Sequence, residues 1–401
     1  MYAAVHSDRS GRVFVSADYA AAVRDGASDA PMAAAIPLPA DAALLPLPDR
    51  EAVAFDRRGR RHVLGPGRWA VGAVLPEGVL RTALPAYTEP SSTAPLPPAP
   101  YAAVGADESG SLVVAAIRIG AVAPAPPVDE ADLAKRISDA LRAHPSNTAL
   151  RHLARCARQD GCPRGRGAFA AGERIIPVTG DRNESPPPGV ALGHQACRTG
   201  RRALVATSDD IAELALAFLA SGAGGVTFGG ACDGEPLLAV RALEEAVGTV
   251  RRERPDAGLT LRSNASVATA LFRACAAGLS ALSVRLASAQ PATYEWFHGP
   301  MGYRWADVVA SLRVASEAGA HVTIEALVLP GLFDRPAETD ALIALAGSLP
   351  KGSAVLLADL PADPGRASGP RRPRQHADGV AAAVARIAAE LPAVRIAAGV
   401  A

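Results

Sequence analysis

The chain has 401 residues, and its 41 Lys and Arg nearly match its 40 Asp and Glu, so the formal net charge is +1. This balance excludes a whole-molecule field that attracts nucleic acid or an anionic membrane, and neither is expected as a partner. Charge, Gly or Pro breaks every apolar run before the ~20 residues of a membrane span, and the first residues do not resemble a secretion signal. Five irregularly spaced cysteines predict no disulfide framework, so a cytoplasmic location is expected.

Residues 1–121 are predicted to form a β-rich accessory domain. Turn-forming Gly and Asp residues separate its candidate strands, which cover Arg12–Ser16, Ala52–Asp56, Trp69–Val74, Tyr101–Ala106 and Ser111–Ile119. No cluster of residues suited to catalysis stands out here. Contact with a substrate or a partner stays open for this part of the chain.

Residues 122–173 are predicted to be a linker followed by bridging helices. The prolines of Val122–Val128 make a stiff linker. Apolar residues then recur at helical spacing in Asp129–Ala143 and in Asn147–Ala157, where Asn147 is a candidate N-cap.

Residues 174–401 alternate strand and helix patterns through six units. The predicted strands are Arg174–Thr179, Gly225–Phe228, Leu259–Ser263, Ala281–Arg285, His321–Leu329 and Ala354–Leu360. The predicted helices are Ser208–Ser221, Leu237–Arg252, Val267–Ala277, Ala306–Ala318, Ala337–Leu349 and His376–Leu391. Right-handed crossovers put such helices outside a parallel sheet, so the predicted fold class is α/β. The pattern suits an open, partial (β/α)6 barrel as well as a doubly wound sheet, and in both the chemistry lies at the carboxyl ends of the strands.

Polar residues follow several of these strands. A glycine turn after the second strand leads to Glu235, and Asn264 follows the third, although capping the next helix is the more common role for such a residue. Ser283 and Arg285 share one side of the fourth strand, where such a pair suits a carboxylate.

These motifs together resemble the core of the radical S-adenosylmethionine (radical SAM) superfamily. The residues that carry the resemblance are Val226–Gly229 followed by Asp233-Gly-Glu-Pro236, Ser263-Asn-Ala265, Ser283–Ser288 with Ala292-Thr-Tyr-Glu295, Trp305–Gly319, and Val328-Leu-Pro-Gly331 with Asp334. The resemblance spans Arg174 to Leu360. Upstream, Arg151–Cys156 with Gly161-Cys162 is similar to the lead-in of a bacterial branch that also has an N-terminal β-rich region.

The resemblance implies a partial barrel of radical SAM type that binds S-adenosylmethionine (SAM). It implies that the turn Asp233-Gly234-Glu235 receives the methionine amino group and that Ser283 and Arg285 contact the carboxylate or the ribose. By the same resemblance Asn264 lines the pocket, and the backbone near Leu329 lies by the adenine.

The hallmark of the superfamily is missing from the loop after the first strand. There the family holds Cys-x3-Cys-x2-Cys, whose thiolates bind a [4Fe–4S] cluster. In this chain the loop is Thr179–Pro188, which contains no thiol, and its Asp181, Asn183 and Glu184 are hard ligands that suit a cluster poorly. A [4Fe–4S] cluster is therefore not expected.

A second set of residues contains side chains that can bind a metal ion. Cys156, Cys162, His194 and Cys197 are of the types that zinc takes. The spacing of the first two is long for a zinc knuckle, and Cys156 suits the apolar face of a helix. No metal site is expected here.

Several functions follow from these observations. The first is a degenerate barrel, a pseudoenzyme candidate that keeps the pocket for SAM and serves in binding, in regulation or as partner of another protein. The second is a SAM-dependent enzyme that uses no radical, with Asp233, Glu235, Glu325 and Asp359 as candidate bases. The third is a radical enzyme with unorthodox ligands, namely Cys156, Cys162 and Cys197. The last is a scaffold without a cofactor, which would be indicated if Glu235 and Ser283 point into side chains rather than a cavity.

Overall fold

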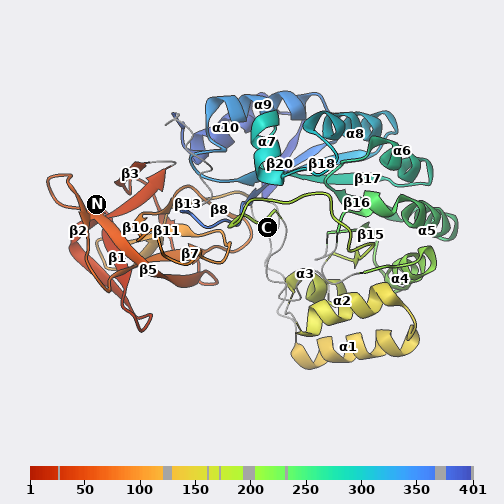
Figure 1. Cartoon of the computed structure of the whole chain (residues 1–401), viewed down its shortest axis with the longest axis horizontal. Coiled ribbons are helices and arrows are strands. Elements are labelled where there is room, and N and C mark those ends of the chain that lie inside the picture. The colour runs from red at the N-terminus through yellow and green to blue at the C-terminus, as the bar shows by residue number, and fades with distance from the viewer. Residues whose placement is uncertain are drawn as a thin grey trace.

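A computed structural model describes residues 1–25, 28–120, 129–159, 162–170, 173–192, 204–230, 234–365 and 376–398. An N-terminal region of strands lies beside a larger part in which strands and helices alternate (Figure 1). In the part of the chain that the structure describes, no helix is long and apolar enough to cross a membrane.

The N-terminal region is built from antiparallel strands, of which β2 and β5 are the long ones. They are β1 (Ala3–Ser7), β2 (Val13–Asp25), β3 (Ser28–Pro31), β4 (Ile36–Pro37), β5 (Ala43–Phe55), β6 (Arg61–Val63), β7 (Trp69–Val74), β8 (Val79–Arg81), β9 (Leu84–Pro85), β10 (Tyr87–Thr88), β11 (Ala102–Ala106), β12 (Leu112–Val114) and β13 (Ala116–Arg118). Their pairings close a ring in which β1 pairs with β2, β2 with β5, β5 with β7, β7 with β11, and β11 again with β1. A closed ring leaves few free strand edges, which protects the region against edge-to-edge association.

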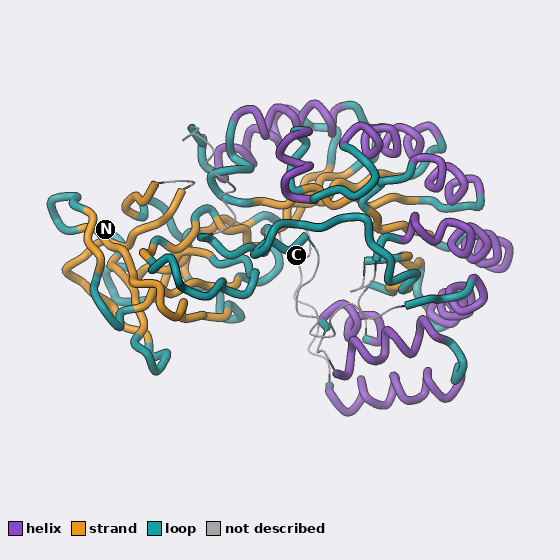
Figure 2. Tube along the Cα trace, in the orientation of Figure 1, coloured by secondary structure: helices purple, strands orange, loops and turns teal. Residues whose placement is uncertain are grey.

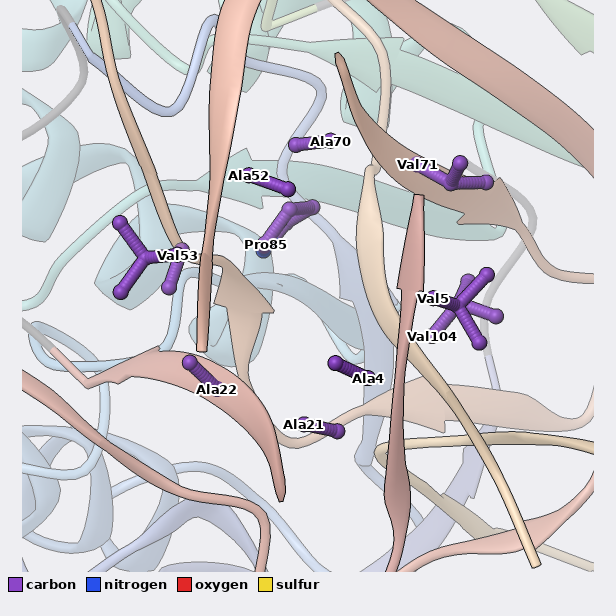
Figure 3. A pocket seen from close by; sticks show the side chains of 11 residues that line it. Ala4, Val5, Ala21, Ala22, Ala52, Val53, Ala70, Val71, Pro85 and Val104 are labelled. Atoms are coloured by element: carbon purple, nitrogen blue, oxygen red, sulfur yellow. The ribbon is translucent and has the colours of Figure 1, made fainter. Parts of the chain in front are cut away.

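Small apolar side chains fill the interior of this ring. Figure 3 shows them converging from several strands, among them Ala4, Ala22, Ala52, Val71 and Val104. The space left between them measures only ≈ 10 Å³, which is about the room of a single water molecule. The interior is therefore a packed core rather than a ligand pocket.

Three helices connect this region to the parallel sheet, namely α1 (Glu130–Ala143), α2 (Thr148–Gln159) and α3 (Pro163–Phe169). The first two were predicted, whereas α3 was not, because its Pro-Arg-Gly-Arg-Gly sequence has almost no helix propensity. The linker Val122–Val128 lies outside the described residues. Tube and ribbon views place α1 and α2 side by side (Figure 2).

The larger part contains a seven-stranded parallel sheet. Its strands are β14 (Ile175–Ile176), β15 (Gly225–Phe228), β16 (Gly258–Ser263), β17 (Ala281–Leu286), β18 (His321–Val328), β19 (Ala354–Asp359) and β20 (Arg395–Ala398). They pair in sequence order without a reversal. A doubly wound sheet reverses its order near the middle, so that alternative is wrong. The prediction of six strands missed β20, because its Arg-Ile-Ala-Ala sequence is too short to show a period.

Helices cover this sheet along one side (Figure 1). They are α4 (Ser208–Ala220), α5 (Val240–Glu253), α6 (Ala268–Ala276), α7 (Pro291–His298), α8 (Trp305–Glu317), α9 (Pro336–Gly347) and α10 (Val380–Glu390). Six of them match predicted helices within a few residues, and α7 was missed. Their apolar faces and the strands share one continuous core that contains Leu243, Leu271, Leu312 and Ile387. The α/β fold class is thereby established, and the carboxyl ends of the strands lie at one edge of the sheet.

Candidate functional site

Glu235 lies in the turn after β15 and is held by its neighbours. Its carboxylate accepts hydrogen bonds from the Ser263 hydroxyl (2.6 Å), the Asn264 backbone N–H (2.8 Å) and the Leu237 backbone N–H (2.9 Å). The residue is buried, and burial raises the pKa of Glu235 to about 7, although the bonds from Ser263 and Asn264 act in the opposite direction. Its side chain caps the 3-10 turn η1 (Pro236–Ala239) and ties the turns after β15 and β16 together.

The loop after β14 contacts this turn. It comprises Thr179–Pro188, and we call it the thiol-free loop. The Gly234 N–H donates to the Thr179 carbonyl (2.6 Å), and the Glu235 N–H donates to the Asp181 carbonyl (2.7 Å). A Cβ atom on Gly234 would lie 1.8 Å from the Asp181 oxygen, so only glycine allows this approach. The Gly-Glu pair of the motif therefore binds the backbone of the thiol-free loop.

The middle of the same loop is bonded to the last residue of α7 and to the residues after it. The Ser185 N–H donates to the carbonyl groups of His298 (3.1 Å) and Gly299 (2.9 Å), and the Met301 N–H donates to the Asn183 carbonyl (2.8 Å). Gly299 has a φ of 53°, and a Cβ there would lie 2.0 Å from the Ser185 oxygen. Backbone bonds on both sides thus set the path of this loop.

Side-chain contacts also hold the thiol-free loop in place. Asn183 donates to the Ser266 hydroxyl (2.9 Å) and accepts from the Asn264 side-chain amide (2.8 Å). The buried ring of His298 stacks on Tyr294 with 4.0 Å between centroids, and its Nδ1 lies 3.4 Å from a Glu184 oxygen. These contacts join the loop to β16 and α7.

A network of charges occupies the middle of the sheet. Glu325 of β18 is 2 % exposed and binds both Arg262 of β16 (2.7 Å) and Arg285 of β17 (2.8 Å). It also accepts a hydrogen bond from the Ser283 hydroxyl (2.7 Å), and Arg262 reaches on to Glu173 (3.0 Å). Burial alone would raise the pKa of Glu325, but Arg285 and Arg262 outweigh it and hold that pKa far below its usual range. The carboxylate is an ion-pair anchor, which argues against a role as base.

One further arginine and one backbone contact extend this network. Arg164 of α3 is buried and donates to the Gly230 carbonyl (3.3 Å), and burial together with Arg262 and Arg285 lowers its pKa to about 10. Arg285 also donates to the Leu192 carbonyl (2.7 Å). α3 and the chain around Leu192 are therefore tied to the turns and side chains at the edge of the sheet.

Apolar side chains close the ends of β17, β18 and β19. We call this set the mouth cluster, and its buried members are Leu84, Val190, Leu192, Ala287, Phe297, Leu327, Leu329, Leu332, Ala358, Leu360 and Ala362. Leu329, which the resemblance places by the adenine, is 3 % exposed within it. Val190 and Leu192 come from the chain after the thiol-free loop, and Leu84 comes from the N-terminal β region. The protein thus fills this space with its own residues.

The thiols among the described residues do not form a donor set for a [4Fe–4S] cluster. Three cysteines fall among the described residues: Cys156 and Cys162 are buried in or beside α2 and α3, and Cys275 lies in α6. Cys162 Sγ accepts a hydrogen bond from the Gly165 N–H (3.5 Å) and caps α3. Within the described residues no group of three or more Cys, His, Asp and Glu side chains is arranged to hold a metal ion. His194 and Cys197 of the second ligand set lie outside them, as does Asp233.

The structure thus brings Gly234, Glu235 and Asn264 together with the thiol-free loop, and Ser283 and Arg285 together with Glu325. Glu235 and Ser283 both point into protein side chains. Asp359, another candidate base, pairs with Arg81 of β8 (3.3 Å).

Sequence reasoning overlooked Arg262 and Arg164, and it considered Asn183 only as a ligand poorly suited to a cluster. Only Arg262 carried a signal, because alternation along its strand puts an arginine between the buried Leu261 and Ser263.

Comparison with known proteins gives structural similarity only. No protein-family model matches the chain. No curated protein matches it either.

Several solved structures resemble the fold at low identity. A radical SAM methyltransferase from Sphaerobacter thermophilus aligns at 18 % identity and a TM-score of 0.37, over 56 % of this chain and 65 % of that one. The radical SAM methyltransferase TsrM from Kitasatospora setae aligns at 16 % and 0.34, over 47 % and 37 %. Methylornithine synthase (PylB) aligns at 18 % and 0.36, over 66 % and 77 %. The chain spans less than two thirds of the length of either methyltransferase. The solved structures to which this chain is similar include radical SAM enzymes.

Proposed function

We propose that this chain is a divergent radical-SAM-like protein that works without a [4Fe–4S] cluster. The observation that carries the proposal is the loop Thr179–Pro188, which has no thiol and is bonded to Gly234 on one side and to Gly299 on the other. A cluster needs several thiolates that converge on it. Placing them here would require new side chains and the release of backbone bonds on both sides. The proposed role is therefore binding, regulation or partnership with another protein rather than radical catalysis.

The proposal includes the organisation of the chain. Residues 1–121 are taken as an accessory β-domain, 122–173 as a linker with bridging helices, and 174–401 as the partial barrel. The sequential order of the parallel strands and the helices on one side support a barrel that is open between β14 and β20.

SAM is the proposed ligand at the strand ends. Gly234 and Glu235, with Asp233, would take its amino group, and Ser283 and Arg285 its carboxylate. Asn264 would line the pocket, and the backbone at Leu329 would lie by the adenine. Because the protein itself satisfies the side chains of Glu235 and Ser283, binding has to exchange some of these bonds for bonds to the ligand.

Isothermal calorimetry with SAM tests this assignment. We expect saturable binding by the full chain, weakened about tenfold or more in Glu235→Gln, because a charge-assisted hydrogen bond contributes about 1.5–3 kcal/mol. Glu317→Gln is the matched control, since this exposed carboxylate pairs with Arg313 at the end of α8 that precedes β18, opposite the carboxyl ends of the strands. No heat at millimolar SAM, or equal weakening in both variants, would remove SAM as the ligand.

A second candidate function is a scaffold that binds no cofactor. The observation that favours it is the orientation of Glu235 and Ser283, whose partners are Ser263 and Glu325. The same titration decides between the two, because a scaffold gives no binding heat while a correctly folded SAM-binding protein does.

A further inference from the structure

One short segment of the N-terminal β region contacts the carboxyl ends of strands in the parallel sheet. This segment is Val79–Pro85, which spans β8 and β9. Arg81 is fully buried and donates to the Leu360 carbonyl (2.5 Å) and to the Tyr101 carbonyl (3.2 Å), and its guanidinium lies 3.3 Å from Asp359. Arg81 therefore joins the β region to the carboxyl end of β19.

The same segment supplies an apolar side chain to the mouth cluster. Leu84 is 4 % exposed and packs in the cluster that contains Leu327 and Leu329 from the end of β18 and Leu360 from beyond β19. These are the strand ends at which ligands bind in open α/β sheets. Arg81 and Leu84 therefore occupy the space that a ligand at β18 and β19 needs.

The segment is held by contacts that a released state can replace. A buried ion pair gives little net stability, because water solvates both charges once the pair separates. β8 pairs with β13 in a separate two-stranded sheet, and β9 pairs with β2 in the eleven-stranded sheet of the β region. The segment is thus part of the β region, and it reaches the strand ends of the parallel sheet through Arg81 and Leu84.

We propose that Val79–Pro85 is an internal plug that closes the carboxyl ends of β18 and β19, and that a ligand reaches them only when the plug withdraws. The regulation of SAM binding by this plug rests on the function proposed above. The plug itself is a property of the closed fold and is tested without any ligand.

Hydrogen–deuterium exchange of the full chain tests the plug. Leu84→Ala removes its apolar contact and Arg81→Met its polar contacts, so that the two variants probe it independently if one folds poorly. We expect amides in segments 327–332 and 357–362 to exchange about tenfold faster than in the parent, with amides of α5 unchanged. Arg61→Met is the control, because this arginine binds Asp29 within the β region and lies on β6, which pairs with β5.

Three outcomes separate the possibilities. Faster exchange confined to the two segments, with SAM affinity raised about tenfold in Leu84→Ala, supports both the plug and its control of binding. Faster exchange in those segments without SAM binding by any variant supports the plug and removes SAM as the ligand. Unchanged exchange in both segments, or an equal rise in α5, overturns the plug.

Discussion

Replacing Glu325 by Gln tests the charge network at the centre of the sheet. The side chain keeps its shape but loses the charge that compensates Arg262 and Arg285, whose side chains are 15 % and 14 % exposed. Glu173 still faces Arg262 from the outer side, whereas Arg285 loses its ion pair with Glu325. Removing one partner of a buried ion pair lowers protein stability by about 3–5 kcal/mol, and we expect the free energy of unfolding to fall by an amount in this range.

Urea unfolding followed by circular dichroism measures this loss. Glu317→Gln is the control, because Glu317 and Arg313 form an exposed pair with 3.9 Å between charged atoms, and such pairs contribute less than about 1 kcal/mol. The double variant Glu325→Gln with Arg285→Met is expected to recover part of the loss, since it also removes one of the two arginines that Glu325 binds. A cost for Glu325→Gln no larger than that of Glu317→Gln would refute this account of the network.

Three further predictions concern the loop, the pH profile and the β region. Gly299→Ala should lower the free energy of unfolding by more than about 1 kcal/mol and speed proteolysis between residues 181 and 188, because its Cβ would lie 2.0 Å from the Ser185 carbonyl oxygen. Proteolysis of this segment at the parent's rate would contradict the contact between the loop and Gly299. Burial, with Asp25 nearby, raises the pKa of Asp334 to about 6, so this group's stabilisation is complete below about pH 4 and is lost as the pH rises to about 6. Asp334→Asn should flatten that part of the urea-midpoint profile, whereas a profile parallel to the parent's would show that Asp334 does not titrate in this range. Ala52→Leu should cost about 1–3 kcal/mol in urea unfolding, because ≈ 10 Å³ cannot hold the added carbons; unchanged stability would mean that the ring has room for a ligand.

The parallel sheet could be predicted because its strands and helices differ in period. Leu282, Val284 and Leu286 of β17 alternate with polar residues, and the helices α4 and α5 show apolar residues at helical spacing. The β region was predicted less fully, since its long strands β2 and β5 are interrupted by proline and charge and bend through several partners. α3 was missed because tertiary contacts override its poor propensity.

The site could be predicted as a set of positions but not as a set of contacts. Strand ends meet at one edge in any parallel sheet, so Glu235 and Ser283 were expected there from order alone. That Ser283 binds Glu325, and that Leu84 comes from a region more than two hundred residues away, depends on packing that leaves no local pattern.

Iron and acid-labile sulfide content after anaerobic purification and reconstitution is the measurement that tests the central claim most directly. We expect a colourless protein with neither element in stoichiometric amount, since Thr179–Pro188 contains no thiol. About four irons and four sulfides per chain, with a visible absorbance that is lost when the cysteines are replaced, would contradict the claim that this fold works without a cluster.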